Sequence, residues 1–325
     1  MMKGRILVTG AAGYIGSVLC RQLLAAGFQV RGLDVLLFGG ESLVEIAGNK
    51  GFEFVKGDVR DNACVAEALR GVDAVVHLAA LVGDKACAEQ AEMAKAVMDD
   101  ASKALYQAAG EAGVKHFVFA STCSNYGLMD GATDPLLDEN APLQPQSLYA
   151  RLKVGFEKHL ITQYSLPRTI LRFATVYGLS PRIRFDLSVN HFTRDIALGR
   201  PLDIFGADTW RPYCHVSDLA RSILLVLNAG PGAMNGKVFN VGDSEENYTK
   251  RSLVEAIQSQ LGPSEVTFRN SSGTDLRNYR IDFSRIRSEL DFQVQNRVPD
   301  GIREVARLVQ SGLLADPDSP RYINA

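Results

Sequence analysis

The sequence predicts an α/β fold in which helices cover both faces of a doubly wound parallel sheet. Short β-branched or apolar runs alternate with segments of helical period, which is typical of such sheets. The chain has 325 residues, of which 46% are hydrophobic, and this is enough to bury a large core. We expect strands near residues 4–9, 28–34, 53–56, 72–78, 115–120, 168–174 and 237–241.

Gly10, Gly13 and Gly16 directly follow the first expected strand. One glycine permits a tight turn, one lets the backbone approach a pyrophosphate, and one lets the next helix pack close to the sheet. We expect that helix to begin near Gly16 and to end at Gly27, with its positive end available to phosphate groups. The spacing predicts a Rossmann-type dinucleotide-binding unit. A turn that only needs small residues is the alternative.

Two aspartates follow the next two expected strands. Asp34 ends the second strand, where a carboxylate accepts hydrogen bonds from the adenosine ribose hydroxyls and repels a 2′-phosphate. No arginine follows it before Arg60, so NAD is favoured over NADP. Asp58 follows the third strand and is a candidate contact for the adenine amino group. For both aspartates, a role in holding a turn is the alternative.

Thr122, Tyr149 and Lys153 form a candidate catalytic group. If the segment from Ser147 onward is helical, positions 149 and 153 share one face, one turn apart. A tyrosine with an ordinary pKa near 10 needs a nearby positive charge to act as a base, and the lysine and an oxidised nicotinamide supply it. Thr122 follows a strand and places its hydroxyl at the carboxyl edge of the sheet. A bare Tyr-x-x-x-Lys occurs by chance, so only the joint arrangement is specific.

The character of the chain changes after about residue 176. Prolines interrupt shorter elements, and arginines become frequent between residues 172 and 211 and between 269 and 307. We interpret this as a smaller C-terminal substrate-binding domain that interleaves with the first. The expected domains are residues 1–175 plus about 216–243 for NAD, and about 176–215 and 244–325 for the substrate.

Composition excludes several classes of protein. With 35 basic and 37 acidic residues the net charge is −2, which gives no global attraction to nucleic acid or to an anionic membrane surface. The five cysteines are scattered without metal-ligand spacing, so we expect neither a metal site nor a disulfide framework. No run approaches eighteen apolar residues, and the N-terminus enters a strand without the pattern of a signal peptide. We therefore expect a cytoplasmic protein with no membrane partner.

Several motifs together resemble one family. The glycine spacing at 10–16, the segment His-Leu-Ala-Ala at 77–80, the catalytic group, and the segments at 171–178 and 210–220 are similar to the extended short-chain dehydrogenase/reductases of the nucleotide-sugar epimerase and dehydratase type. The resemblance implies an NAD-dependent homodimeric enzyme that acts on a nucleoside-diphosphate sugar. It implies cofactor contacts at Gly10, Gly13, Tyr14, Ile15, Gly16, Asp34, Asp58, Val59, Leu78, Ala79, Ala80, Tyr149 and Lys153.

The resemblance also implies substrate contacts. Arg211 and Arg277 match family arginines that contact the substrate diphosphate, and a guanidinium grips phosphate oxygens bidentately. For Arg277, an exposed cation is the alternative. Asn190 precedes an expected helix at 191–198 and is a candidate for phosphate or nucleoside contact, with helix capping as the alternative. His215 is expected to pack structurally. The full substrate set is Thr122, Ser124, Tyr149, Asn190, Arg211 and Arg277.

Two positions after Thr122 depart from the dehydratases of this family. Those enzymes carry an Asp-Glu pair there as acid and base, whereas this chain has Cys123 and Ser124. Neither group readily replaces a carboxylic acid, so a 4,6-dehydratase is disfavoured. Cys123 leaves epimerisation at C3 or C5 open, because some relatives use a nearby cysteine, and a small buried apolar residue is the alternative.

The leading hypothesis is a nucleotide-sugar 4-epimerase. Tyr149 removes the proton of the C4 hydroxyl, hydride passes to NAD, and the 4-keto sugar turns and takes the hydride back on its other face. The alternative is a net C4 dehydrogenase or 4-ketoreductase with exchangeable NAD(H). A catalytically silent nucleotide-sensing protein is the third hypothesis, and the intact Thr122, Tyr149 and Lys153 argue against it.

Overall fold

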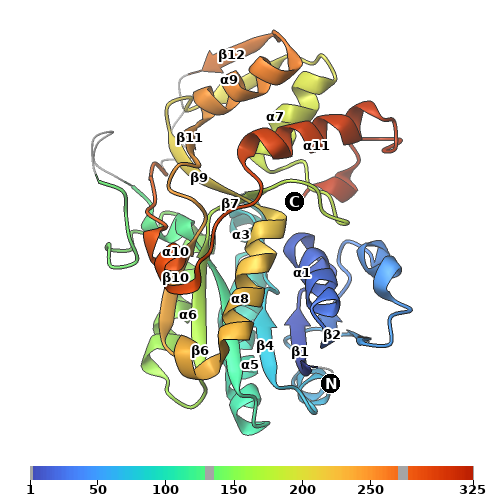
Figure 1. Cartoon of the computed structure of the whole chain (residues 1–325), viewed down its shortest axis with the longest axis vertical. Helices are drawn as coiled ribbons and strands as arrows, with labels where there is room; N and C mark the ends of the chain where they lie inside the picture. The colour runs from blue at the N-terminus through green and yellow to red at the C-terminus, as the bar shows by residue number, and fades with distance from the viewer. Residues whose placement is uncertain (1–2, 129–134, 270–276, 325) are drawn as a thin grey trace.

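The centre of the molecule is a parallel sheet, which confirms the predicted fold class. The computed structural model describes residues 3–128, 135–269 and 277–324, and every structural statement below refers to these residues. Within them, seven strands lie in the order β10-β6-β5-β4-β1-β2-β3 (Figure 1). Their bounds, close to the predicted ones, are β1 (Lys3–Thr9), β2 (Phe28–Asp34), β3 (Phe52–Lys56), β4 (Ala74–His77), β5 (His116–Thr122), β6 (Arg168–Phe173) and β10 (Lys237–Val241).

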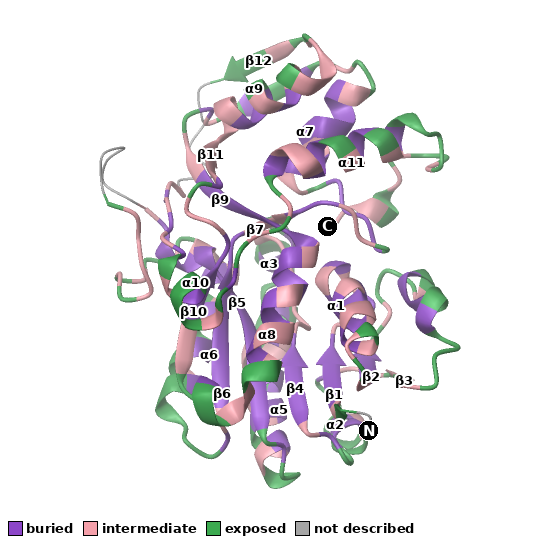
Figure 2. Ribbon diagram, in the orientation of Figure 1, coloured by how far each residue is buried: buried purple, intermediate pink, exposed green. Residues whose placement is uncertain are grey.

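The central strands are buried on both faces. Every residue of β4, β5 and β6 is buried, and Figure 2 shows these strands in the colour of buried residues. Near-continuous apolar runs of this kind are what a parallel sheet between two helical layers requires. β3 lies at one edge of the sheet and is correspondingly more exposed.

Helices cover both faces of this sheet. Side chains of α1 and α8 share one core cluster, and side chains of α2, α5 and α6 share another. The first layer is α1 (Tyr14–Ala25), α8 (Val216–Met234, kinked at Gly230) and α10 (Ser284–Leu290). The second layer is α2 (Asn62–Ala68), α5 (Ala101–Glu111) and α6 (Leu148–Thr162), and α5 is preceded by α3 (Asp84–Glu89), α4 (Ala91–Lys95) and a π-helical turn (Ala96–Asp100). Short 3-10 turns lie at Glu41–Ile46, Cys123–Tyr126 and Pro320–Tyr322.

A smaller part stands over the carboxyl edge of the sheet (Figure 1). It holds a three-stranded sheet in the order β11-β9-β7 and the pair β12-β8. The strands are β7 (Thr175–Tyr177), β8 (Leu202–Phe205), β9 (Trp210–His215), β11 (Asn247–Thr249) and β12 (Val266–Arg269). Three helices pack around a core of their own, namely α7 (Ser188–Ala197), α9 (Lys250–Leu261) and α11 (Val298–Gln310). No helix in the described ranges is long and apolar enough to cross a membrane.

A buried ion pair ties α6 to the strands beneath it. Arg172 of β6 donates from Nη2 to Oε2 of Glu157 on α6 at 2.8 Å, and both side chains are almost completely buried. Glu157 also accepts hydrogen bonds from Ser121 of β5 and from Asn125. Because one carboxylate serves three elements, it fixes the end of β5 against α6.

We predict that Arg172→Met lowers the free energy of unfolding by about 3–5 kcal/mol, since it leaves the Glu157 carboxylate buried without its cation. Urea denaturation at pH 7 measures this loss. The double variant Glu157→Leu/Arg172→Met removes both charges and should lose clearly less. A double variant as unstable as the single one would contradict the argument.

Candidate active site

A cavity of about 890 Å³ opens at the carboxyl edge of the large sheet. It lies where the strand order reverses, between β1 and β4, which is the position where open α/β sheets bind their ligands. Its wall is built from the glycine turn, from the ends of β2, β4 and β5, and from residues of the smaller part. This volume is at the upper end of the range for small-molecule and cofactor sites.

The glycine turn leaves no room for a side chain at Gly10 or Gly16. Gly10 has φ of +74°, a conformation that favours glycine. A Cβ atom on Gly16 would lie 2.0 Å from the Gly10 carbonyl oxygen, so α1 can pack against the turn only with glycine there. Gly13, Tyr14 and Ile15 line the cavity, and α1 has no side-chain cap at its start. The positive end of α1 therefore faces the cavity and fits a pyrophosphate.

Asp34 and Asp58 also line the cavity, at the ends of their strands. The Asp34 carboxylate accepts hydrogen bonds from the backbone N–H groups of Ala12, at 2.9 Å, and Leu36, at 2.8 Å. Burial raises the pKa of Asp34, and these two hydrogen bonds oppose that effect. Asp58 is paired with Arg60 at 2.6 Å, and the hydrogen bond from Arg60 lowers the pKa of Asp58. Both carboxylates thus hold local turns and face the cavity at once.

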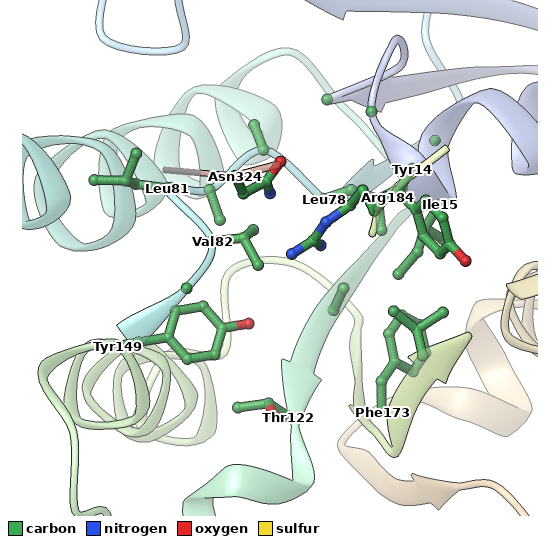
Figure 3. A pocket seen from close by; sticks show the side chains of 18 of the residues that line it. Tyr14, Ile15, Leu78, Leu81, Val82, Thr122, Tyr149, Phe173, Arg184 and Asn324 are labelled. Carbon is green, nitrogen blue, oxygen red and sulfur yellow. The ribbon is translucent and has the colours of Figure 1, made fainter. Parts of the chain in front are cut away.

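The candidate catalytic residues come together as predicted. Thr122 is the last residue of β5, and Tyr149 and Lys153 lie one turn apart on α6, whose start is capped by the Ser147 hydroxyl. Figure 3 shows the side chains of Thr122 and Tyr149 projecting into the same space. Lys153 Nζ donates to the Ala120 carbonyl oxygen at 2.7 Å and lies 5.8 Å from the centre of the Tyr149 ring. The lysine is thereby fixed to β5 and lies beside the tyrosine ring.

Burial decides the protonation of this group. It raises the pKa of Tyr149. Cys87 and Asp84 raise this pKa further, and Arg184 lowers it. Burial lowers the pKa of Lys153 to about 8. The sequence predicted that Lys153 would lower the pKa of Tyr149, but desolvation is the largest influence on both groups. The phenolate therefore needs a further cation, such as an oxidised nicotinamide.

Two arginines from distant parts of the chain meet on one wall. Arg211 of β9 donates from Nη1 to the Arg277 carbonyl oxygen, and its guanidinium lies 5.2 Å from the Tyr279 ring centre. Arg277 pairs with Asp84 at 2.9 Å and donates to the Ser124 hydroxyl at 3.4 Å. The sequence left open whether Arg277 was an exposed cation, and the structure places it in the cavity wall.

Asn190 alone among the predicted site residues does not line the cavity. It lies within α7, which starts at Ser188, so the capping alternative was wrong: the helix begins earlier than the expected 191–198. The fully buried Asn190 amide accepts from the Gly178 N–H at 2.9 Å and donates to the Arg184 carbonyl at 2.9 Å and the Tyr14 hydroxyl at 3.1 Å. Asn190 therefore holds the segment that follows β7, and its substrate contact stays a prediction.

The cavity wall also contains residues that sequence reasoning missed. Arg182, Arg184 and Tyr279 line it, and so do Ile323 and Asn324 from the C-terminal segment. Figure 3 shows Arg184 and Asn324 across the space from Tyr149. For Arg182 and Arg184, the only signal in the sequence was the frequency of arginines between residues 172 and 211. No motif marked Tyr279, Ile323 or Asn324.

Cys123 and His215 have structural roles. Cys123 is buried, its thiol donates to the Arg172 carbonyl at 3.2 Å, and burial raises its pKa well above the ordinary value. His215 hydrogen-bonds to Glu304 at 2.5 Å and to the Ser217 hydroxyl at 2.7 Å, as expected of a structural histidine. In the described ranges, no group of three or more His, Cys, Asp or Glu residues is arranged to hold a metal ion.

Comparisons with known proteins agree with this geometry. The family model described as NAD dependent epimerase/dehydratase family matches residues 6–242. The chain is 35% identical over 321 residues to a UDP-glucose 4-epimerase of Mycolicibacterium smegmatis, covering 94% of this chain and 99% of the relative. The UDP-glucose 4-epimerase of Thermus thermophilus in complex with NAD superposes with a TM-score of 0.82 at 28% identity, covering 95% and 100% of the two chains. DesIV, a dTDP-glucose 4,6-dehydratase of Streptomyces venezuelae solved with NAD, gives a TM-score of 0.84 at 31% identity, covering 94% and 97%.

We predict that Lys153 titrates near pH 8 and not at its ordinary value of 10.5, because burial removes water from the ammonium and favours the neutral amine. The Cε chemical shift of ¹³C-labelled lysine measures the midpoint, and Lys153→Arg assigns the signal. Between these two pH values the unfolded chain binds more protons at this site, so the contribution of Lys153 to the unfolding free energy rises with pH. A midpoint above pH 10 would show that the amine is hydrated.

Proposed function

The chain belongs to the NAD dependent epimerase/dehydratase family, and on this basis we propose that it is a nucleotide-sugar 4-epimerase. It is an enzyme of the extended short-chain dehydrogenase/reductase family, and its cofactor is NAD. Its relatives include both epimerases and dehydratases, so family membership alone does not select the reaction.

One observation supports epimerisation over dehydration. The two positions that follow Thr122 hold a thiol and a hydroxyl where dehydratases of the family need an acid and a base. Cys123 points into the core and Ser124 lines the cavity, with its hydroxyl 3.2 Å from the Tyr279 hydroxyl. Asp84 also lines the cavity, but it is engaged by Arg277. This arrangement favours a reaction that needs proton transfer at one hydroxyl only.

The same burial of Cys123 argues against a C3 or C5 epimerase. Abstraction of a proton from carbon by cysteine needs a thiolate that reaches the substrate. The Cys123 thiol is buried away from the cavity, and its raised pKa keeps it protonated.

In the proposed mechanism each residue has one task. When bound, NAD supplies the group that accepts hydride from C4 of the sugar and returns it. Tyr149 takes the proton of the C4 hydroxyl and gives it back, while Thr122 orients that hydroxyl from the end of β5. Lys153 is held by the Ala120 carbonyl and places its ammonium beside the Tyr149 ring. The first turn of α1 binds the cofactor phosphates.

We assign substrate binding to the part of the cavity wall that contains Arg211 and Arg277. Arg211 and Arg277 would hold the diphosphate, because two guanidinium groups from different elements can grip several phosphate oxygens at once. Ser124 and Thr122 would contact the sugar. Held mainly through its diphosphate, the sugar can present either face after oxidation. The homodimer, the cytoplasmic location and the domain boundaries stay predictions.

The direct test is to denature the purified protein, identify any released nucleotide, and incubate the native enzyme with UDP-, GDP- and dTDP-sugars without added cofactor. We expect bound NAD and inversion at C4, with deuterium at C4 retained on the sugar. Turnover only with added NAD(H) would identify the C4 dehydrogenase or 4-ketoreductase. Washout of deuterium from C3 or C5 would identify the other epimerase class, and no turnover with any sugar would support the silent protein.

We predict that Tyr149→Phe lowers turnover by about 10²–10⁴-fold, since it removes the proton-transferring hydroxyl. NAD content after purification should be unchanged. Tyr164→Phe is the matched control, because Tyr164 is 81% exposed and outside the cavity wall. Undiminished turnover in Tyr149→Phe would refute the catalytic assignment.

A further inference from the structure

We propose that Arg182 is a ligand for the pyrophosphate of the cofactor, in addition to the glycine turn. The inference rests on NAD as the cofactor and not on which sugar carbon reacts. Arg182 belongs to the segment between β7 and α7, outside the glycine-turn motif, and it lines the same cavity.

The first observation is a buried cation with unused donors. Arg182 is only 7% exposed, and its Nε and Nη2 atoms are buried without a hydrogen-bond acceptor among the described residues. Its guanidinium lies 4.0 Å from the centre of the Phe38 ring. Arg184, by contrast, donates to the Asp186 carboxylate at 3.0 Å. A buried charge without a partner is unfavourable, so the side chain is arranged for an anion that comes from outside the chain.

The second observation is the position of the segment that holds Arg182. The Tyr14 hydroxyl donates to the Gly178 carbonyl, and the Ser180 hydroxyl donates to the Tyr14 carbonyl at 2.7 Å. Ser180 Oγ in turn accepts from the Arg182 N–H at 3.3 Å. Tyr14 is the first residue of α1, whose N-terminus faces the cavity. The segment thus places Arg182 beside the helix end that binds phosphate.

The third observation distinguishes the cofactor from the substrate. Phe38, which packs on the guanidinium, lies on the loop after β2 and four residues beyond Asp34. That loop borders the place where a dinucleotide holds its adenosine. Arg211 and Arg277 lie instead beside Tyr279 and Ser124. The anion within reach of Arg182 is therefore one that is joined to adenosine. Because Asp34 disfavours a 2′-phosphate on the same wall, that anion is the pyrophosphate.

Electrostatics agrees with this assignment. Burial and the like charge of Arg184 lower the pKa of Arg182 to about 10, so the guanidinium still bears its charge at neutral pH. A pyrophosphate brings negative charge to the two neighbouring cations, Arg182 and Arg184. Its oxygens are acceptors for Nε and Nη2 of Arg182, and a guanidinium binds such oxygens bidentately.

The test compares Arg182→Ala and Arg182→Lys with the wild type. Calorimetry on NAD-depleted protein gives the dissociation constants for NAD, NADP, ADP, UDP and adenosine, and the NAD content of the freshly purified holoenzyme is a second readout. For Arg182→Ala we expect NAD and ADP to bind about 10–100-fold more weakly, as when a charged hydrogen-bond partner is lost. Adenosine should change by less than about twofold, and lysine should restore part of the loss because it returns the charge without the bidentate geometry.

Arg251→Ala is the matched control. Arg251 also packs on a phenylalanine, 4.3 Å from the Phe268 ring centre, and pairs with Asp208 at 2.9 Å, but it lies outside the cavity wall. Its removal should leave NAD and ADP binding unchanged. Arg211→Ala should weaken UDP binding and spare ADP.

Four results would overturn the proposal. Unchanged ADP affinity in Arg182→Ala would show that no phosphate contact exists, and an equal loss for adenosine would show that the side chain only packs the wall. Loss of UDP affinity with ADP unchanged would assign Arg182 to the substrate diphosphate. A loss confined to NADP would assign it to a 2′-phosphate. If Arg182→Ala does not fold, Arg182→Gln removes the charge but keeps a hydrogen-bonding side chain, and it is judged by the same outcomes.

Discussion

The close packing of α1 against the glycine turn is the constraint on which the rest of the site depends. A Cβ atom at Gly16 would overlap the Gly10 carbonyl oxygen, so the helix can approach only because position 16 lacks a side chain. This approach aims the positive end of α1 into the cavity. It also brings Tyr14 within reach of Gly178 and Asn190, which joins the smaller part of the molecule to the cofactor turn.

Buried polar groups then arrange the chemistry at the opposite side of the cavity. The ion pair of Glu157 with Arg172 joins α6 to β6, and the Ser121 hydroxyl joins Glu157 to β5. One turn before Glu157, Lys153 bonds to the backbone of β5. Burial raises the pKa of Tyr149 and lowers that of Lys153. The protein alone therefore favours a neutral tyrosine, and a bound cationic group would complete the conditions for a base.

Local patterns predicted the scaffold, and together with the family resemblance they predicted part of the cavity wall. The strands of the large sheet could be predicted because apolar runs and turn residues are local signals, and the glycine turn because its steric demands fix the spacing. The capping alternative for Asn190 was wrong because its helix begins three residues before the start that local patterns indicated. The contact of Arg182 with Phe38 and the C-terminal residues in the wall could not be predicted, since they join segments far apart in the sequence whose packing no motif encodes.

The repeated crossing of the chain between the two parts has a consequence for how such enzymes diversify. The segment after β7 lies against α1, β11 follows β10, and α10 returns to the large sheet before α11 leaves it again. No single cut in the sequence separates the two parts, so exchanging one of them by recombination needs several crossovers. Substitutions along the cavity wall, by contrast, can change the substrate preference and leave the cofactor scaffold as it is.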